Sequence, residues 1–202
     1  NDKKAVQSQI SILVDGDTMN LNDRQKSNVF NKYFGGSMSG LVFQEIWEFK
    51  SLAYSAWGSY RSPYYLDDSG RFEGFMGTQA DKTIDAIETY VQLLKEMPEK
   101  PLRADGIRSG LLQSLNSSKP RFRNMSLSIR GWEKQGYVSD PRKTKKDVFE
   151  DVKFDDIVDF YSAFIKDKPI TITIVGNKDK IDMEKLSKFG EVIEVKKEDI
   201  FN

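Results

Sequence analysis

The chain of 202 residues is 38% hydrophobic and 12% aromatic, which is enough to bury a core and indicates a globular protein. Its 31 basic and 31 acidic residues balance, so the total charge does not favour a nucleic acid or an anionic membrane as the partner. The absence of Cys and His excludes disulfides, thiolate nucleophiles and cysteine-ligated metals, and leaves carboxylates, Lys and Tyr for acid–base chemistry.

A strand and a helix are predicted first. The stretch QISILV at 9–14 alternates apolar and polar residues and ends in the turn-like DGD, which is typical of a strand with one buried face. Asn22 and Gln25 have the spacing of a helix-capping pair, and apolar residues follow at helical spacing until Gly35 and Gly36. We therefore expect a helix of about three turns that ends at this glycine pair.

A short helix and a hairpin are expected next. Ser39 has the character of an N-cap for GLVFQEIWEF, whose apolar residues form one stripe. Residues 52–60 and 70–78 both alternate with a period of two, and the turn-rich SPYYLDDSG separates them. These two segments are predicted to pair as a hairpin with a long loop.

Four helices are predicted in the middle of the chain, because apolar residues recur there at intervals of three and four. The stretches are 84–94, 107–115, 122–132 and 157–165. Asp81 is the expected N-cap of the first, and Asp155 or Asp156 opens the last. Phe122 and Trp132 belong to the apolar stripe of the third, so we expect both to be buried.

Two final strands are predicted from their strong β propensity, PITITIV at 169–175 and EVIEV at 191–195. Strands separated by a block of helices favour the α+β class over a doubly wound fold. We expect a mixed, largely antiparallel sheet with helices packed on one face. Residues 1–202 are expected to form one domain, because the terminal strands need the middle hairpin as their partner.

The chain shows no targeting or membrane segment. No window approaches the roughly 18 apolar residues that a membrane span needs, and NDKKAVQSQ at the start lacks a signal-peptide apolar region. We expect no membrane span. Because the chain starts without Met and close to a strand, we also expect it to be a piece of a longer polypeptide.

Basic residues gather between positions 119 and 146, where nine Lys or Arg stand against two acidic residues. Aromatic residues lie among these cations, as they do on surfaces that stack single-stranded nucleic acid. Since two of those aromatics belong to a helix stripe, we prefer a solvated basic face. A nucleic-acid-binding module is the weaker alternative.

Arg130 and Tyr137 are the candidate site residues. They lie seven residues apart, or two helical turns, although Gly136 is expected to end the helix just before Tyr137. A guanidinium and a phenol can both hold a carbonyl or a carboxylate without changing protonation at neutral pH. Spacing alone favours a structural role for the pair.

The stretch YFGGSMSGLVFQEIWEFKSLAYSAWGSY at 33–60 resembles the C-terminal-type domain of the insulinase or pitrilysin family, the inverted-zinc metallopeptidases. It follows the family pattern of Tyr-hydrophobic-Gly-Gly, a small-residue run, an LFQEIRE-like helix and a GLAYS-like strand, and departs from it where WEF replaces REK. The likeness continues through FMGTQADKTIDAI and PITITIVGN. It implies that Gly35 and Gly36 allow close packing and that SLAYSAWGSY is a central strand.

The resemblance also implies a division of labour. Family enzymes bind zinc through H-x-x-E-H and a further Glu, and this chain has no His. We therefore expect a non-catalytic domain, inactive alone and binding no cofactor itself. It would close against a catalytic zinc domain, in the same polypeptide or in a partner subunit, to form a peptide chamber.

Arg130 and Tyr137 gain a role from the resemblance. Family members carry an Arg and a Tyr at this spacing opposite the zinc, where they hold the substrate backbone and help to polarise the scissile carbonyl. We expect a substrate-clamping domain of a zinc metalloendopeptidase that acts on unstructured peptides. A scaffold paralogue of the same fold without a catalytic contribution is the alternative. We favour the periplasm over the cytoplasm, although neither follows from the residues.

Overall fold

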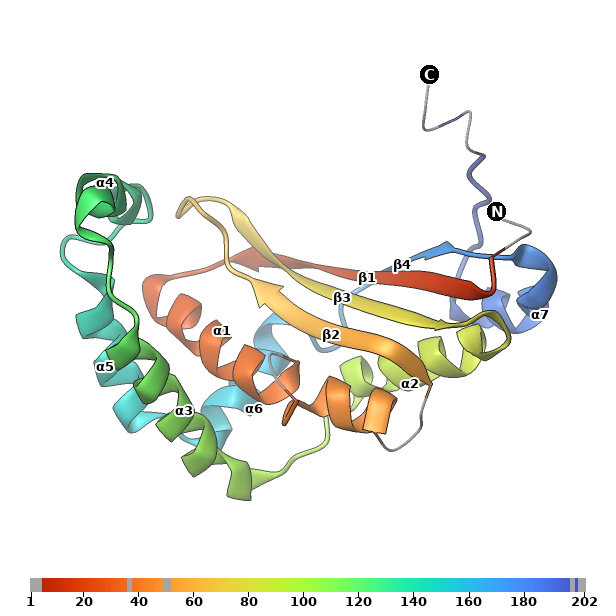
Figure 1. The fold of residues 1–202 in the computed structure, drawn as a ribbon, viewed down its shortest axis with the longest axis horizontal. Helices are drawn as coiled ribbons and strands as arrows, with labels where there is room; N and C mark the ends of the chain where they lie inside the picture. Colours follow the sequence, from red (N-terminus) through yellow and green to blue (C-terminus); the bar gives the residue numbers. More distant parts are fainter. Residues whose placement is uncertain (1–4, 36–37, 49–51, 197–198, 200–202) are drawn as a thin grey trace.

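A computed structural model describes residues 5–35, 38–48, 52–196 and 199 (Figure 1). Its sheet has four strands in the order β2-β3-β1-β4, and all three neighbouring pairs are antiparallel. The strands are β1 (Gln7–Thr18), β2 (Ala53–Arg61), β3 (Ser69–Gln79) and β4 (Ile170–Val175). This arrangement confirms the α+β class and the expected hairpin of β2 and β3.

Helices cover one face of this sheet, as Figure 1 shows for α1, α2 and α6. The helices are α1 (Leu21–Phe34), the π-helix η1 (Phe43–Glu48), α2 (Thr83–Lys95), α3 (Ala104–Ser117), α4 (Met125–Lys134), α5 (Pro141–Asp151), α6 (Phe154–Phe164) and α7 (Met183–Leu186). Short 3₁₀ turns are η2 (Ala80–Lys82), η3 (Pro101–Arg103), η4 (Phe122–Asn124), η5 (Lys178–Lys180) and η6 (Ser187–Phe189). The helical layer confirms the predicted one-sided architecture.

The two faces of the sheet differ in burial because the side chains alternate along each strand. Ile10, Ile12 and Val14 of β1 point into the helical layer and are buried. On the opposite face, Trp57 lies across from Phe75, and their rings stack at a centroid distance of 6.3 Å. The sheet therefore has one closed face and one open face, which carries partly exposed aromatic rings.

A notch of glycines brings the helices close to the sheet. Gly58 of β2 and Gly74 of β3 lie directly opposite each other, and the fully buried Tyr90 of α2 fills the space beside them. The Tyr90 hydroxyl donates a hydrogen bond of 2.8 Å to the Trp57 carbonyl oxygen. From α1, Gly35 approaches so closely that a Cβ there would lie 2.7 Å from the Gly58 nitrogen. The close packing expected at Gly35 is confirmed, and Gly36 lies outside the described residues.

Two strand predictions are wrong. Residues 191–195 form no strand and remain exposed, although Val192, Ile193 and Val195 favour β structure. SLAYSAWGSY contains β2, which is an edge strand of the described sheet and not a central one. β2 pairs with its neighbour in sequence, β3, but the other partner of β3 is β1, so β2 has only one strand partner.

The beginnings of several helices also differ from the predictions. Asn20 caps α1 in place of Asn22, with its side chain accepting from the Asp23 amide. No side-chain cap precedes α2, so Asp81 is not its N-cap. Asp156 is the third residue of α6, where its carboxylate closes a capping box by accepting from the Lys153 amide at 2.9 Å.

Asp156 also joins α6 to α1, because Lys26 forms an ion pair of 2.7 Å with its carboxylate. Burial opposes ionisation of Asp156, but the hydrogen bonds from Lys26 and from the Lys153 amide outweigh it and lower the pKa of this carboxyl. Two packed helices are thus linked by one partly buried carboxylate.

Gly74→Ala should destabilise the fold by about 1–3 kcal/mol, because the added Cβ forces the core around Tyr90 apart. That Cβ would lie 2.8 Å from the Tyr90 Cζ. Gly106→Ala is the matched control, since a Cβ on this α3 glycine meets no atom within 4 Å. It should stabilise the helix by up to about 1 kcal/mol. Urea unfolding measures the free energy of unfolding of both variants. An equal change in the two variants would contradict close packing at Gly74.

Asp156→Asn should lower the free energy of unfolding at neutral pH by about 1 kcal/mol through loss of the capping and ionic contacts. The folded-state pKa of Asp156 is lowered from 3.8, so its contribution is present above about pH 4 and disappears as the pH falls through the folded-state pKa. Unfolding of the variant and the natural chain between acidic and neutral pH should therefore show a gap that closes in acid. A gap that is constant across this range would refute the assignment.

Candidate functional site

Arg130 lies on α4, the helix that stands beside the tip of the β2–β3 hairpin (Figure 1). None of the residues of α4 is buried, and Arg130 is exposed. The hairpin loop at 62–68 supports the helix, since a Cβ on Gly131 would lie 3.6 Å from the Tyr64 hydroxyl oxygen. Arg130 is thus presented to solvent by a helix outside the main helical layer.

Tyr137 follows a sharp turn that ends α4. Gly136 adopts a left-handed conformation with φ of +86°, which favours glycine. The amide of Tyr137 donates to the Trp132 carbonyl at 2.9 Å and the amide of Gly136 donates to Glu133 at 3.0 Å, the two bonds of a Schellman motif. A side chain at Gly136 would also overlap Leu66 of the hairpin loop. The predicted helix end at Gly136 is confirmed.

The Tyr137 side chain points into the protein and is buried. Gln25 of α1 donates a hydrogen bond to its hydroxyl. Burial raises the pKa of Tyr137, while the bond from Gln25 and the nearby charge of Arg24 partly offset that effect, so the phenol is neutral at physiological pH. In the described part of the chain no hydrogen bond joins Arg130 to Tyr137. The two lie on one continuous segment but in different environments.

Arg24 and Gln25 were not predicted as site residues. Arg24 is only 5% exposed and donates to the Tyr65 carbonyl at 2.6 Å, so it ties α1 to the hairpin loop. The Nε of Arg24 and the Oε1 of Gln25 find no partner within the described residues. Their burial could not be predicted from the sequence, because both are polar side chains near the start of an amphipathic helix.

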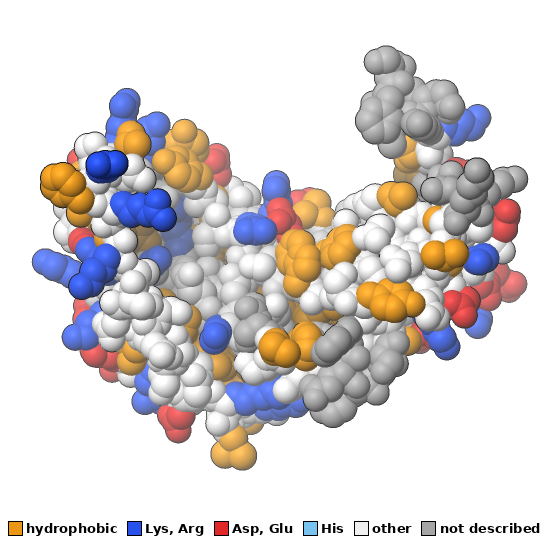
Figure 2. Space-filling model, viewed as in Figure 1, with side chains coloured by type: hydrophobic (Ala, Val, Ile, Leu, Met, Phe, Trp, Pro, Cys, Tyr) orange, Lys and Arg blue, Asp and Glu red, His pale blue; other side chains and the backbone are white. Residues whose placement is uncertain are grey.

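The basic run of 119–146 covers the α4–α5 end of the molecule, where Figure 2 shows blue side chains gathered. Six of its cations are exposed and enter no ion pair in the described residues: Lys119, Arg121, Arg123, Arg130, Lys134 and Lys143. The expected burial of the run's aromatics is wrong for Phe122, which is 91% exposed, and Trp132 is only half-buried. Phe122 lies in the exposed turn η4 before the helix, and Trp132 lies on α4, which is next to the hairpin loop.

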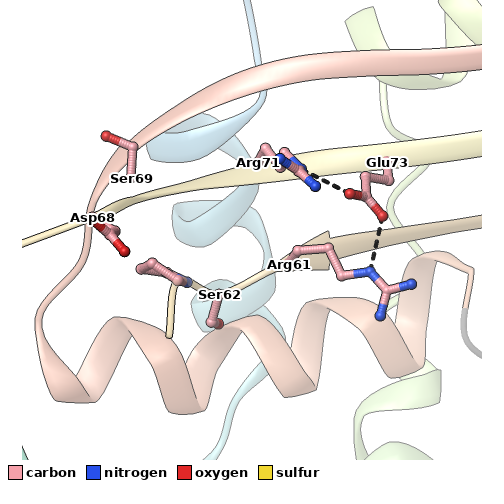
Figure 3. Close-up of a pocket in the computed structure, with 7 residues that line it drawn as sticks. Arg61, Ser62, Asp68, Ser69, Arg71 and Glu73 are labelled. Carbon is pink, nitrogen blue, oxygen red and sulfur yellow. Dashed lines mark hydrogen bonds and ion pairs between the residues drawn. The ribbon is translucent and has the colours of Figure 1, made fainter. Parts of the chain in front are cut away.

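A hollow of about 420 Å³ lies where the strands of the same hairpin meet its loop, and Figure 3 shows most of its lining. Arg61 and Arg71 are cross-strand partners, and Glu73 lies between them. The Nε atoms of the two arginines donate to the Glu73 carboxylate at 3.0 and 2.7 Å, respectively. Burial opposes ionisation of Glu73, but the two guanidinium groups outweigh it and lower its pKa.

The structure also bears on metals and membranes. Within the described residues, no group of three or more His, Cys, Asp or Glu side chains could hold a metal ion. No helix in that part of the chain is both long and apolar enough to cross a membrane.

Known proteins resemble this chain in sequence and in fold. The family model for the peptidase M16 inactive domain matches residues 1–105. The uncharacterized zinc protease YmxG of Bacillus subtilis is 38% identical over 101 residues, which are 50% of this chain and 22% of that protein. A protease from Helicobacter pylori superposes with a TM-score of 0.69 at 16% identity, covering 87% of this chain and 42% of that one. A peptidase M16 inactive domain from Pseudomonas fluorescens gives 0.68 at 14% identity, covering 85% and 42%.

These three relatives are all longer, and the chain spans less than half the length of each. The two solved structures share so few identical residues that they support the fold alone. The family model is different, because it matches the sequence itself over more than half of the chain, including the stretch at 33–60. The chain belongs to the peptidase M16 family, and the part of that family it represents is the inactive domain.

Proposed function

We propose that this chain is the substrate-clamping domain of a zinc metalloendopeptidase. Zinc, its ligands and the water-activating carboxylate would come from a catalytic domain of the same polypeptide or of a partner subunit, since this chain contains no His or Cys. The observation that carries the proposal is the presentation of Arg130, an exposed cation without an ion pair among the described residues, on a helix that stands clear of the helical layer.

Arg130 suits the task of holding a peptide. A guanidinium keeps its charge at every physiological pH and offers several donors in a fixed plane, so it can grip a backbone carbonyl without taking part in proton transfer. A donor aimed at the oxygen that gains negative charge stabilises the transition state more than the ground state. Arg130 would act in this way next to a zinc ion held by the catalytic domain.

Tyr137, whose side chain is buried, would position the clamp from inside this domain. Its hydroxyl oxygen accepts from Gln25, and its own hydrogen has no acceptor among the described residues. The Schellman turn at Gly136 fixes the direction in which α4 leaves this anchor, and therefore fixes where Arg130 lies. A donor held by such a rigid support is already in place before the reaction, so no free energy is lost in reorganising it in the transition state.

The peptide itself would bind in extended form along a sheet edge. β2 is an edge strand of the described sheet. Its outer edge is closed at Tyr60, where the Asn31 side chain accepts from the amide at 2.6 Å and donates to the carbonyl at 2.9 Å, and at Gly58, where Gly35 approaches, so the peptide would add to the part of β2 before Gly58. An added strand gains backbone hydrogen bonds regardless of sequence, which suits an enzyme that acts on unstructured peptides. Exposed Tyr54 and Trp57 on β2 would contact alternate side chains of such a peptide.

The test uses the parent polypeptide with its zinc domain and an unstructured fluorogenic peptide. Arg130→Ala and Tyr137→Phe should each lower kcat/KM at least about tenfold, because each removes a transition-state donor or its support. Arg123→Ala, which removes a neighbouring exposed cation of the same run, should keep the rate of the natural enzyme. Zinc content should be unchanged in all three, and the melting temperature should be unchanged in the two arginine variants. Tyr137→Phe should melt a few degrees lower, because it leaves the buried Gln25 amide without its acceptor.

Cleavage at the natural rate by both Arg130→Ala and Tyr137→Phe would refute the clamp. The scaffold interpretation, in which the fold serves only assembly, would then be preferred. A loss of activity shared equally by Arg123→Ala would also count against the clamp, because it would point to general charge attraction rather than to a specific contact.

A further inference from the structure

We propose that Arg61 and Arg71 form a binding site for a peptide carboxylate in the hollow where β2 and β3 meet the hairpin loop. Binding of the carboxylate is a property of this chain alone. The consequence for the enzyme, that peptides bearing a suitably placed carboxylate are preferred, rests on the proposed clamping function.

The two guanidinium groups are held side by side against their mutual repulsion. Arg61 and Arg71 lie directly opposite each other on neighbouring antiparallel strands, an arrangement that costs free energy for like charges. Glu73 relieves this cost by accepting one hydrogen bond from each. The Glu73 carboxylate thus keeps the two guanidinium groups close together on an exposed surface, where their mutual repulsion would otherwise drive them apart.

The hydrogen bonds to Glu73 leave the terminal N–H groups of both arginines available, and these are the groups that bind carboxylates. Each arginine donates to Glu73 through Nε alone, so its Nη1 and Nη2 atoms make no hydrogen bond within the described residues. Figure 3 shows the terminal nitrogens of Arg61 turned away from Glu73. Paired N–H groups on one guanidinium match the two oxygens of a carboxylate, and such charge-assisted bonds are stronger than neutral ones.

Other carboxylates near the arginines do not occupy these nitrogen atoms. Asp68 also lines the hollow, and Figure 3 shows it at the end away from Glu73. Asp15 of β1 is the register partner of Arg71 on its other side. In the described part of the chain neither aspartate forms an ion pair with Arg61 or Arg71. Ser62 and Ser69 complete the lining with hydroxyl groups.

An aromatic shelf adjoins the site. The Arg61 guanidinium carbon lies 6.0 Å from the centre of the Trp57 ring, and Trp57 stacks on Phe75. Stacking on an aromatic face restricts the guanidinium and lowers the entropy lost on binding. A peptide with a carboxylate beside an apolar side chain would match both features. The structure thus assigns this face a preference for acidic residues flanked by apolar ones.

One short loop, residues 62–68, contacts both the hollow and the segment that carries Arg130. Ser62 and Asp68 of the hairpin loop line the hollow, while Tyr64 and Leu66 of the same loop contact the glycines at 131 and 136 around the end of α4. A peptide held in this hollow would therefore lie near the segment that carries Arg130.

The experiment measures binding of labelled peptides to the 202-residue chain by fluorescence anisotropy at low ionic strength. Three acetylated hexapeptides are compared, each with one variable residue between leucines: Glu with an amidated C-terminus, Gln with an amidated C-terminus, and Gln with a free C-terminal carboxylate. We expect at least one carboxylate peptide to bind about fivefold or more tightly than the Gln amide. Preference for the Glu amide identifies a side-chain carboxylate, and preference for the free acid alone identifies the peptide terminus.

Arg61→Gln and Arg71→Gln should each abolish this preference. Both side chains are exposed, so the fold should survive, and circular dichroism confirms it. Arg108→Gln is the matched control, because it removes another arginine that is paired with a carboxylate, Asp105 of α3. It should keep the preference. Equal binding of all three peptides, or a preference that survives in both hairpin variants, would overturn the proposal.

Cleavage by the parent polypeptide separates this proposal from the clamp. If Arg130→Ala leaves cleavage unchanged while Arg61→Gln abolishes carboxylate binding, the clamp fails and the carboxylate site stands. If Arg130→Ala lowers cleavage while the three peptides bind equally, the clamp stands and the carboxylate site fails.

Discussion

The close approach of two helices to the sheet at Gly58 is the constraint on which the rest of the structure depends. Gly35 at the end of α1 meets Gly58 from one side, and Tyr90 of α2 fills the notch between Gly58 and Gly74. A close-packed interior cannot absorb an extra methyl group at such a point without displacing a whole element. This contact holds the helical layer against one face of the sheet and leaves the other face open.

The features to which we assign a function lie where that layer ends. The hairpin loop at 62–68 packs against the end of α4, and the arginine pair flanks the loop where it joins β2 and β3. Buried Arg24 and Gln25 of α1 connect the loop and Tyr137 to the core through hydrogen bonds. A rigid scaffold therefore positions exposed cations, which is the arrangement a binding domain needs when another domain supplies the chemistry.

Much of the fold could be predicted because its elements carry strong local signals. The alternation at 9–14 and at 70–78 identifies strands with one buried face, and the glycine at 136 identifies a helix end. The missed helix α5 also had a local signal, since Asp140 caps it and Pro141 occupies its first position. The strand order had none, because it depends on which long-range pairs form.

The remaining errors arise from tertiary packing. EVIEV at 191–195 has the composition of a strand, but a strand needs a partner, and the described sheet does not provide one there. Phe122 has helical spacing relative to other apolar residues, yet its stripe faces the hairpin loop and solvent. The arginine pair could not be predicted at all, because it exists only through the register of β2 against β3.

The most direct measurement is a structure of the parent polypeptide with a bound peptide, in which the water-activating Glu of the zinc domain has been replaced by Gln. We expect the Arg130 guanidinium to lie within hydrogen-bonding distance of a peptide carbonyl oxygen near the zinc. The Tyr137 segment should keep its contact with Gln25. An Arg130 side chain on the outer surface, facing solvent while peptide occupies the zinc site, would refute the clamp.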